Sequence, residues 1–325
     1  MDARSFNHRP FDRSLPTSQN APEQPSLVPP ISQRIYPVRR YHLELTLTCG
    51  QAFRWTPIEH SWVGAVGEHW IRIGQDRASL IIETTHSNPN WELIEQYFQI
   101  HLDIDAITAQ FPTDQHLSRA ESMCRGLRLL RQPKWECLAS FILSSTKQIP
   151  HIQRLTASLA EEFGKPLTVP PNHPPAFTFP TPETLATISE QHLRSLGLGY
   201  RAPYLRDTAR MIAQGQVSLE EIASLPYQEA RKQLETLPGV GPKIADCALL
   251  FAYGEQQAFP IDVWVQRALS ELYFSTDTPS RRELETFAAS YFAPFGGYAQ
   301  QYLFHYMRTA HGRQRRQSPI NDHQR

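Results

Sequence analysis

The sequence predicts an α+β protein in which a small antiparallel β-sheet precedes a helical body. Three observations favour this fold class. Residues 36–83 hold short segments rich in aromatic and β-branched residues, separated by glycines and polar residues. From Asn88 to His311 the apolar residues instead recur at helical spacing. Proline-rich stretches at 1–35 and 165–181 interrupt both patterns, because proline fixes φ and removes a hydrogen-bond donor.

The strand-like segments are SWVGAV (61–66), HWIRIG (69–74) and ASLIIET (78–84). Their separation suits hairpins, so we predict an antiparallel sheet of about five strands beginning at Tyr36. The preceding residues, 1–35, have six prolines and no apolar period, which predicts a disordered lead. They also lack the apolar core of a signal peptide.

The helical pattern begins with NPNWELIEQYFQ, where we expect Asn88 as the cap and Pro89 as the first helical residue. A clear amphipathic helix follows at 149–164, ending at Gly164. We divide the chain into a lead at 1–35, a sheet domain with helices at 36–125, a two-part helical domain at 126–312 and a flexible basic tail at 313–325.

Composition excludes several classes of protein. The formal net charge of the 325 residues is +0, which by itself says nothing about nucleic acid. Apolar runs are too short for a membrane span, which needs about 20 residues. The four cysteines have no CxxC spacing and the 13 histidines no metal-ligand spacing, so we expect neither a disulfide framework nor a metal or other cofactor. Lysine is rare, occurring only at Lys134, Lys147, Lys165, Lys232 and Lys243.

The segment LPGVGPK (237–243) predicts a tight hairpin between two helices. Gly239 and Gly241 permit positive φ and, with Val240 between them, expose successive backbone N–H groups at the start of a helix. Successive N–H groups of this kind form an anion-binding nest. A helix-hairpin-helix unit binds a DNA phosphate in this way, independently of the base sequence. An ordinary turn between two helices is the simpler alternative.

An aspartate, Asp262, stands just before another predicted helix, 19 residues after Lys243. An amine nucleophile must be unprotonated, whereas free lysine has a pKa of about 10.4. Burial, a helix N-terminus or a neighbouring base can supply that state. A carboxylate nearby can stabilise positive charge on a reacting sugar. Asp262 is also a good helix cap. A solvated lysine at a helix start is the alternative for Lys243, and the rarity of lysine in this chain weakens it.

Residues 237–262 resemble the signature of the helix-hairpin-helix DNA glycosylase superfamily. Further segments resemble the 8-oxoguanine DNA glycosylases: CGQAFRW (49–55), SFILSS (140–145), LGLGYRAPYL (196–205) and GYAQQYLF (297–304). The resemblance runs from about Tyr36 to Arg308. It implies a base-excision repair enzyme with DNA N-glycosylase and AP-lyase activity on duplex DNA containing 8-oxoguanine.

The resemblance also implies roles for residues of the active site. Lys243 would attack C1′ of the flipped nucleotide and form a Schiff base. Asp262 would activate the lysine and stabilise the sugar cation, after which β-elimination cuts the strand 3′ to the lesion. Gly50 would accept a hydrogen bond from N7–H of the oxidised base, a hydrogen that guanine lacks.

Five other residues receive roles in recognition. Phe304 and Cys247 would sandwich the flipped base, and Gln300 would bond its Watson–Crick edge. Tyr200 would wedge into the duplex, and Arg201 would read the orphaned cytosine. Each has a structural alternative, such as core packing for Phe304 and Cys247 or surface exposure for Gln300 and Arg201.

The sequence departs from the family pattern at three positions. Thr146, His151 and Trp264 replace an asparagine, an arginine and a histidine that contact the opposite cytosine or the DNA backbone. These departures do not affect the residues proposed for catalysis, Lys243 and Asp262. They leave open how strictly the protein requires cytosine opposite the lesion. Cys49 and Phe251 are milder differences.

Two other functions stay open on the sequence alone. One is a monofunctional glycosylase for another damaged purine, using Asp262 and water, which the presence of Lys243 disfavours. The other is a DNA-binding module without catalysis. We expect a monomer that acts without a membrane, in the bacterial cytoplasm at the nucleoid or in a eukaryotic nucleus.

Overall fold

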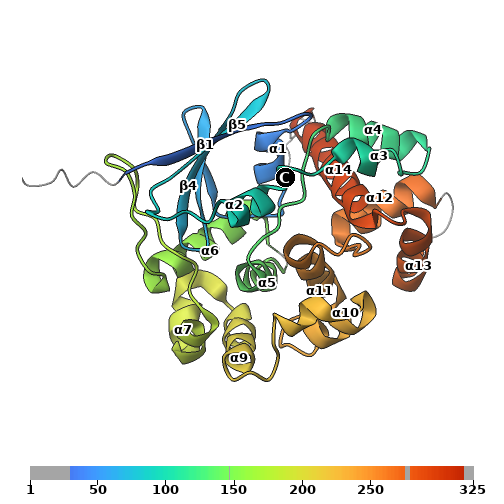
Figure 1. Cartoon of the computed structure of the whole chain (residues 1–325). Helices are drawn as coiled ribbons and strands as arrows, with labels where there is room; N and C mark the ends of the chain where they lie inside the picture. Colours follow the sequence, from blue (N-terminus) through green and yellow to red (C-terminus); the bar gives the residue numbers. More distant parts are fainter. Residues whose placement is uncertain (1–29, 146, 275–278, 318–325) are drawn as a thin grey trace, which may run out of the picture.

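The N-terminal part of the chain folds into one antiparallel sheet with strand order β1-β5-β4-β3-β2 (Figure 1). The computed structural model describes residues 30–145, 147–274 and 279–317. The strands are β1 (Ser32–Pro37), β2 (Trp55–Ile58), β3 (Ser61–Val66), β4 (His69–Gln75) and β5 (Ser79–Thr84). The predicted five-stranded sheet is therefore confirmed.

Strand β1 begins earlier than predicted, inside the proline-rich lead. Ser32 already pairs with Thr84 of β5, four residues before Tyr36. Backbone pairing with a neighbouring strand holds this segment extended, and the side-chain pattern does not reveal it because only Tyr36 of β1 is buried.

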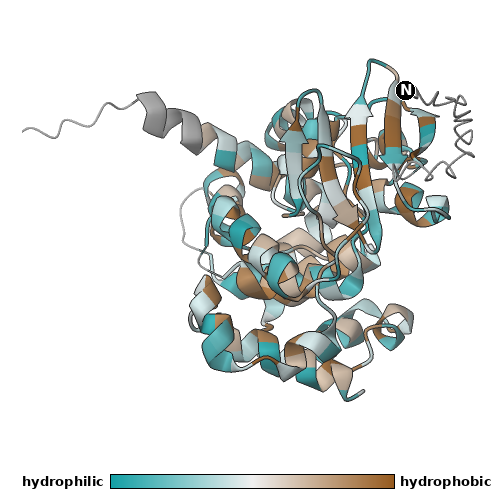
Figure 2. Cartoon of the chain, turned by 90° about the vertical axis from the view of Figure 1, so that its left-hand side faces the viewer, coloured by the Kyte–Doolittle hydropathy of each residue, from teal (hydrophilic) through white to brown (hydrophobic). Residues whose placement is uncertain are grey.

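One face of the sheet is covered by helices. Alternate residues of β5 are buried, and the alternation of polar and apolar residues along the strands can be followed in Figure 2. Their apolar side chains pack against α2 (Trp91–Phe98), where the Trp55 indole donates a 2.9 Å hydrogen bond to the Tyr97 hydroxyl. Helix α2 starts at Trp91 with Asn90 as its cap, not at Pro89 as predicted, because the Asn90 side chain accepts from the Leu93 amide.

The rest of the described chain is mainly helical. The other helices are α1 (Leu43–Thr48), α3 (Ile104–Thr108), α4 (Gln115–Met123), α5 (Lys134–Leu143), α6 (Ile149–Phe163), α7 (Pro182–Thr187), α8 (Glu190–Leu193), α9 (Arg201–Ala213), α10 (Tyr227–Glu235), α11 (Pro242–Ala248), α12 (Val263–Tyr273), α13 (Arg281–Tyr291) and α14 (Gly296–Gln317). Single turns of π-helix follow α8 (η1, Arg194–Leu198) and α11 (η3, Leu249–Tyr253), and a 3₁₀ turn (η2, Glu221–Ser224) precedes α10.

Helix α5 occupies the middle of the helical body. It packs against α6 and α9 on one side and α11 on the other (Figure 1). Seven of its ten residues are buried, which explains the nearly continuous apolar sequence of this helix. Residues at the end of α5 are therefore within reach of both parts of the helical body.

The buried apolar residues form two cores, which share some stretches of the chain. The sheet core reaches from Tyr36 to Leu130, whereas α3 and α4 contribute to the helical core. Helix α4 packs against α14, which continues to Gln317, five residues beyond the predicted domain end. The helical core thus combines α3 and α4 with the final helix, α14, from distant parts of the chain.

Helix α1 lies between the two cores. Leu43 and Leu47 belong to the sheet core, while Leu45 and Cys49 belong to the helical core. Because residues on opposite helix faces are buried on different sides, α1 fixes the position of the residue that follows it, Gly50.

The two helices of the predicted hairpin unit, α10 and α11, are joined by a buried ionic contact. Asp246 accepts a 2.8 Å hydrogen bond from the Tyr227 hydroxyl and lies 3.4 Å from Nε of Arg231. Burial raises the pKa of Asp246 to about 6, and Arg231 opposes that rise. In the described part of the chain no helix is long and apolar enough to span a membrane.

A glycine at the end of α6 is required for a reason the sequence did not show. Gly164 has an ordinary negative φ, but a Cβ there would overlap the Thr178 carbonyl oxygen.

We expect Gly164→Ala to lower the free energy of unfolding by about 1–3 kcal/mol through this overlap, measured by urea denaturation. Gly74→Ala is the control, because its Cβ would meet nothing closer than 3.8 Å. Equal stability of both variants contradicts the prediction.

Candidate active site

The hairpin between α10 and α11 presents backbone donors at its tip. Gly239 has φ of +76°, and a Cβ there would lie 2.7 Å from Cβ of Tyr204. Gly241 caps α11 with φ of −99°, so only Gly239 adopts the positive φ that both glycines permit. Val240 is buried and fixes the hairpin to the core. The N–H groups of Gly239, Gly241 and Lys243 bond to nothing in the described chain, which suits an anion.

A narrow pocket beside the hairpin unites six residues singled out in the sequence. They are Gly50, Lys243, Cys247, Asp262, Gln300 and Phe304. The inner pocket has a volume of about 40 Å³, room for about three water molecules. It opens into an outer pocket of about 360 Å³ that shares Gly50, Lys243, Asp262 and Phe304 with it. The residues therefore come together although they span most of the chain.

Gly50 contributes its backbone to this pocket. Its φ is +92°, and a Cβ there would lie 2.7 Å from Cδ1 of Ile149, so glycine is required. Helix α14 holds the two preceding carbonyls: Arg308 donates to Thr48 O at 3.3 Å and Gln301 to Cys49 O at 3.1 Å. Nothing in the described chain donates to the Gly50 carbonyl. That carbonyl is available to a ligand that carries a hydrogen-bond donor.

Gln300 offers a second acceptor in the pocket. The residue is 4% exposed, and its Nε2 donates to the Pro260 carbonyl at 3.1 Å. That bond fixes the amide orientation, because a carbonyl can only accept. Oε1 is buried and has no partner in the described chain. A buried acceptor without a partner costs about 1–3 kcal/mol, which a ligand donor would recover.

Lys243 and Asp262 supply the charged groups of the site. Nζ of Lys243 donates to Ser144 Oγ at 3.2 Å and lies 4.9 Å from the centre of the Phe141 ring. Asp262 caps α12 by accepting from the Trp264 and Val265 amides at 3.0 and 2.9 Å. Burial raises the pKa of Asp262, while the Val265 amide and the charge of Lys243 oppose the rise. The cap predicted for Asp262 is confirmed.

Cys247 and Phe304 form apolar walls of the pocket. Burial raises the pKa of the Cys247 thiol to about 12, so the thiol is neutral near pH 7. The Arg308 guanidinium lies 5.5 Å from the centre of the Phe304 ring. Both residues line the inner pocket. The predicted stacking of a flat base between these two side chains requires that position.

Tyr200 and Arg201 lie outside this pocket, at the start of α9. Tyr200 is 49% exposed, whereas Arg201 is only 2% exposed. Arg201 donates to the carbonyls of Leu198 and Ser145 and to the Tyr200 hydroxyl. The side chain predicted to read the opposite strand therefore points inward, and reading a base requires it to turn.

The structure describes two of the three residues that depart from the family pattern, and one of them lines the site. His151 on α6 is 3.4 Å from Arg154, and its pKa is lowered by burial and by Lys147, Arg154 and Arg201. Trp264 lines the outer pocket. Thr146 lies outside the described residues.

Sequence reasoning missed four residues that the structure brings to the site: Phe141, Ser144, Gln301 and Arg308. Phe141 and Ser144 stand three residues apart in SFILSS, which places them on one face of a helix. That spacing was the available signal. Gln301 and Arg308 gave none, because their bonds to the Gly50 loop join residues more than 250 positions apart.

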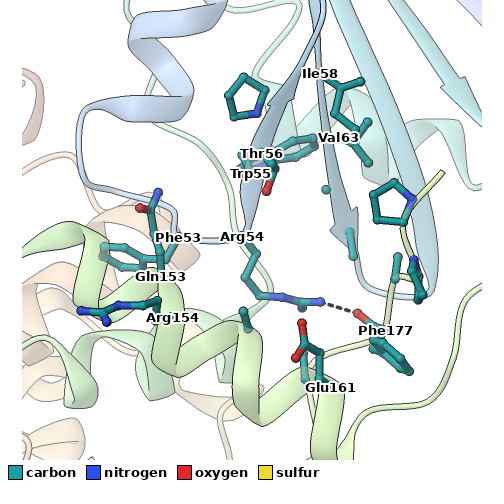
Figure 3. A pocket seen from close by; sticks show the side chains of 18 of the residues that line it. Phe53, Arg54, Trp55, Thr56, Ile58, Val63, Gln153, Arg154, Glu161 and Phe177 are labelled. Atoms are coloured by element: carbon teal, nitrogen blue, oxygen red, sulfur yellow. Dashed lines mark hydrogen bonds between the residues drawn. The ribbon is translucent and has the colours of Figure 1, made fainter. Parts of the chain in front are cut away.

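A larger pocket of about 540 Å³ lies between β2, β3, α6 and residues 174–177 (Figure 3). Arg54, one of the charged residues that line it, donates to the Phe177 carbonyl and forms an ion pair with Glu136. Volume alone is thus a poor guide to the active site here. Within the described ranges no group of three or more histidine, cysteine, aspartate or glutamate side chains could hold a metal ion.

Two family models match consecutive parts of the chain. The N-terminal domain of 8-oxoguanine DNA glycosylase matches residues 35–138. The HhH-GPD superfamily of base excision DNA repair proteins matches residues 139–294. Together they cover the sheet, α5 and the hairpin unit.

Curated relatives agree with these models. A probable N-glycosylase/DNA lyase of Methanothermobacter thermautotrophicus is 33% identical over 67% of this chain and 75% of its own length. The N-glycosylase/DNA lyase OGG1 of Arabidopsis thaliana is 30% identical over 90% of this chain and 89% of its own.

Solved structures share the whole arrangement of sheet and helices. The 8-oxoguanine glycosylase/lyase of Clostridium acetobutylicum, in complex with DNA containing cytosine opposite 8-oxoG, has a TM-score of 0.80 and 31% identity, covering 87% of this chain and 99% of that one. MBOgg1 bound to a low-affinity DNA ligand has a TM-score of 0.82 and 32% identity over 86% and 96% of the two chains. A 3-methyladenine DNA-glycosylase from Archaeoglobus fulgidus, at 21% identity, shares the fold. On the two family models and these full-length relatives, the chain belongs to the 8-oxoguanine DNA glycosylase family of HhH-GPD base-excision repair proteins.

Proposed function

We propose that this protein removes 8-oxoguanine from duplex DNA and cuts the strand at the resulting site, with Lys243 as the nucleophile. The observation that carries the proposal is the inner pocket. It combines an amine, a buried carboxylate, the unbonded Gly50 carbonyl and the unbonded Oε1 of Gln300. A purine with the right donors satisfies both acceptors at once.

The proposed chemistry needs only these groups. Nζ of Lys243 attacks C1′, and the bond from C1′ to N9 breaks, with its electron pair leaving on the base. Asp262 stabilises positive charge on the sugar and accepts the proton that the amine loses. Ring opening gives a Schiff base, from which loss of a C2′ proton expels the 3′ phosphate. The released base serves as a proton carrier in this step.

Base recognition follows from the two free acceptors. The Gly50 carbonyl accepts from N7–H of 8-oxoguanine, whereas N7 of guanine is itself an acceptor and would face it unfavourably. Gln300 Oε1 accepts from the donors on the Watson–Crick edge. Cys247 and Phe304 contact the two faces of the ring.

Entry of the base requires movement. A base inside the stack cannot be attacked, so it must be flipped out, at a cost of a few kcal/mol. In the DNA-free protein the inner pocket has room for about three waters, less than a purine needs. Phe304, which lines both the inner and the outer pocket, is placed to move during entry.

The duplex contacts are proposed as follows. The hairpin at Gly239, Val240 and Gly241 holds a phosphate of the damaged strand, Tyr200 fills the gap left by the flipped base, and Arg201 turns out to the opposite base. No membrane or cofactor enters this scheme. The protein acts as a monomer where the genome lies, in the nucleoid of a bacterium or the nucleus of a eukaryote.

Lys243→Gln tests the nucleophile. We expect wild-type protein to give a borohydride-trapped covalent adduct with an 8-oxoguanine duplex, and Lys243→Gln to give none, because the amide cannot form an imine. Lys232→Gln is the matched control, since Lys232 is an exposed lysine on α10.

The same assay separates the competing functions. Base release by wild-type protein without an adduct would favour a monofunctional glycosylase that uses Asp262 and water. Tight binding with an intact duplex would favour a DNA-binding module. Either result rejects Lys243 as the nucleophile.

Asp262→Asn tests the carboxylate. Asparagine caps a helix as well as aspartate does, so the fold should persist. We expect single-turnover base release to slow about 100-fold or more, with DNA affinity changed little. Since burial raises the pKa of Asp262, the wild-type rate should fall on acidification at a pH above the ordinary aspartate range. Asp103→Asn, at the cap of α3, is the control. A wild-type rate in Asp262→Asn contradicts the role.

His151→Arg tests the opposite-strand contact. Excision of 8-oxoguanine is measured opposite each of the four bases. We expect the variant to favour cytosine about tenfold more than wild type, because a guanidinium adds two donors for the acceptor atoms of that base. Gln153→Arg, on another face of α6, controls for the added charge. An unchanged ratio in His151→Arg would show that the position does not read the opposite base.

A further inference from the structure

The last turn of α5 contacts the lysine proposed as nucleophile, although no role has been assigned to it. Phe141 and Ser144 stand three residues apart, on one face of the helix. Lys243 comes from α11, which packs against α5. The amine thus meets side chains of a helix that carries neither Asp262 nor the DNA-binding hairpin.

Two contacts define the position of the amine. Nζ lies 4.9 Å from the centre of the Phe141 ring, within the range of a cation–π interaction. It also donates to Ser144 Oγ at 3.2 Å. The Ser144 hydroxyl in turn donates to the Phe141 carbonyl at 2.7 Å. Since that bond uses the hydroxyl hydrogen, Ser144 presents only acceptor lone pairs to Lys243.

The Phe141 ring is itself held firmly. It stacks on Phe251 with a centre distance of 5.5 Å and an interplanar angle of 14°. Phe53 contacts it edge-on at 5.6 Å. Phe251 comes from the π-helical turn η3 and lines the inner pocket. The surface under the lysine is therefore continuous with the wall of the pocket.

A flexible lysine needs such support to react efficiently. Its four-carbon stem leaves the amine free to adopt many positions. Attack on C1′ requires one of them, with the reacting atoms about 3–3.5 Å apart and aligned. A ring face below the amine and an acceptor beside it remove most of that freedom before DNA binds.

We propose that Phe141 and Ser144 are positioning residues that hold the Lys243 amine for attack on C1′. The inference rests on the proposed function, because it assumes that Lys243 is the nucleophile. In the opposite case, the contact of Lys243 with Phe141 and Ser144 holds the amine away from C1′ and must break before reaction. Removing the contact would then speed adduct formation, whereas loss of a positioning contact slows it.

The experiment uses a duplex with a preformed abasic site, so that base excision plays no part. The rate of borohydride-trapped adduct formation is measured under single-turnover conditions for Ser144→Ala, Ser144→Thr and Phe141→Leu. DNA affinity and melting temperature are measured alongside. We expect Ser144→Ala and Phe141→Leu to slow adduct formation about tenfold or more, with affinity within about twofold of wild type. Ser144→Thr, which keeps the hydroxyl, should restore most of the rate.

Matched controls separate positioning from stability. Ser224 bonds the carbonyl three residues before it at 2.7 Å, as Ser144 does, but lies outside both pockets. Phe98 is a fully buried aromatic residue of the sheet core. Ser224→Ala and Phe98→Leu should change the melting temperature by amounts similar to those of the test variants and leave the rate of adduct formation intact.

The outcomes are distinguishable. Wild-type or faster adduct formation in Ser144→Ala overturns the inference, even where Phe141→Leu fails to fold. Equal slowing by Ser144→Ala and Ser144→Thr also overturns it, since the hydroxyl would then be irrelevant. Absence of any adduct with wild-type protein overturns the proposed function itself, and the inference with it.

Discussion

The site depends on the way one short loop, between α1 and β2, is fixed at the junction of the two cores. Gln51 is fully buried there, and its amide bonds the Thr46 and Arg128 carbonyls and the Leu130 amide. The backbone carbonyl of Gln51 accepts a hydrogen bond from the Gln132 side chain. A buried amide group that lacks a hydrogen-bond partner costs about 1–3 kcal/mol. The loop therefore has one favourable conformation, in which all of these bonds form. That conformation brings the backbone of the neighbouring Gly50 to the pocket.

The same loop shows that the pocket needs both the N-terminal part of the chain and the helical body. Residues before the sheet's first hairpin supply a backbone carbonyl, and the final helix supplies Gln300, Phe304 and the side chains that hold the loop. Lys243 and Asp262, the proposed reacting residues, lie between them in sequence. The two free acceptors proposed to recognise the base thus come from the outer segments, and the groups proposed for the chemistry from the middle. The sheet is remote from the reaction, yet it anchors one wall of the pocket.

Much of this architecture could be predicted from the sequence, because it is encoded locally. Short segments rich in aromatic and β-branched residues predicted the sheet, and the spacing of Lys243 and Asp262 predicted the centre of the candidate site. What failed is non-local or sterically subtle. Strand β1 is extended because β5 pairs with it. Both hairpin glycines permit a positive φ, and the segment alone does not show that only Gly239 adopts it. The inward orientation of Arg201 depends on carbonyls from two other segments, which no pattern within α9 could reveal.

The end of α5 has one more consequence. Ser144 and Ser145 are consecutive: the hydroxyl of the first accepts from Lys243, and the carbonyl of the second accepts from both Arg201 and Tyr200, the latter at a long 3.4 Å. Tyr200 and Arg201 thus share one backbone acceptor, which belongs to the residue directly after the serine whose side chain accepts from Lys243. In the proposed complex, where Tyr200 and Arg201 turn toward DNA, the Ser145 carbonyl loses both of these donors, so that DNA binding and the support of the amine are linked through adjacent residues of one segment.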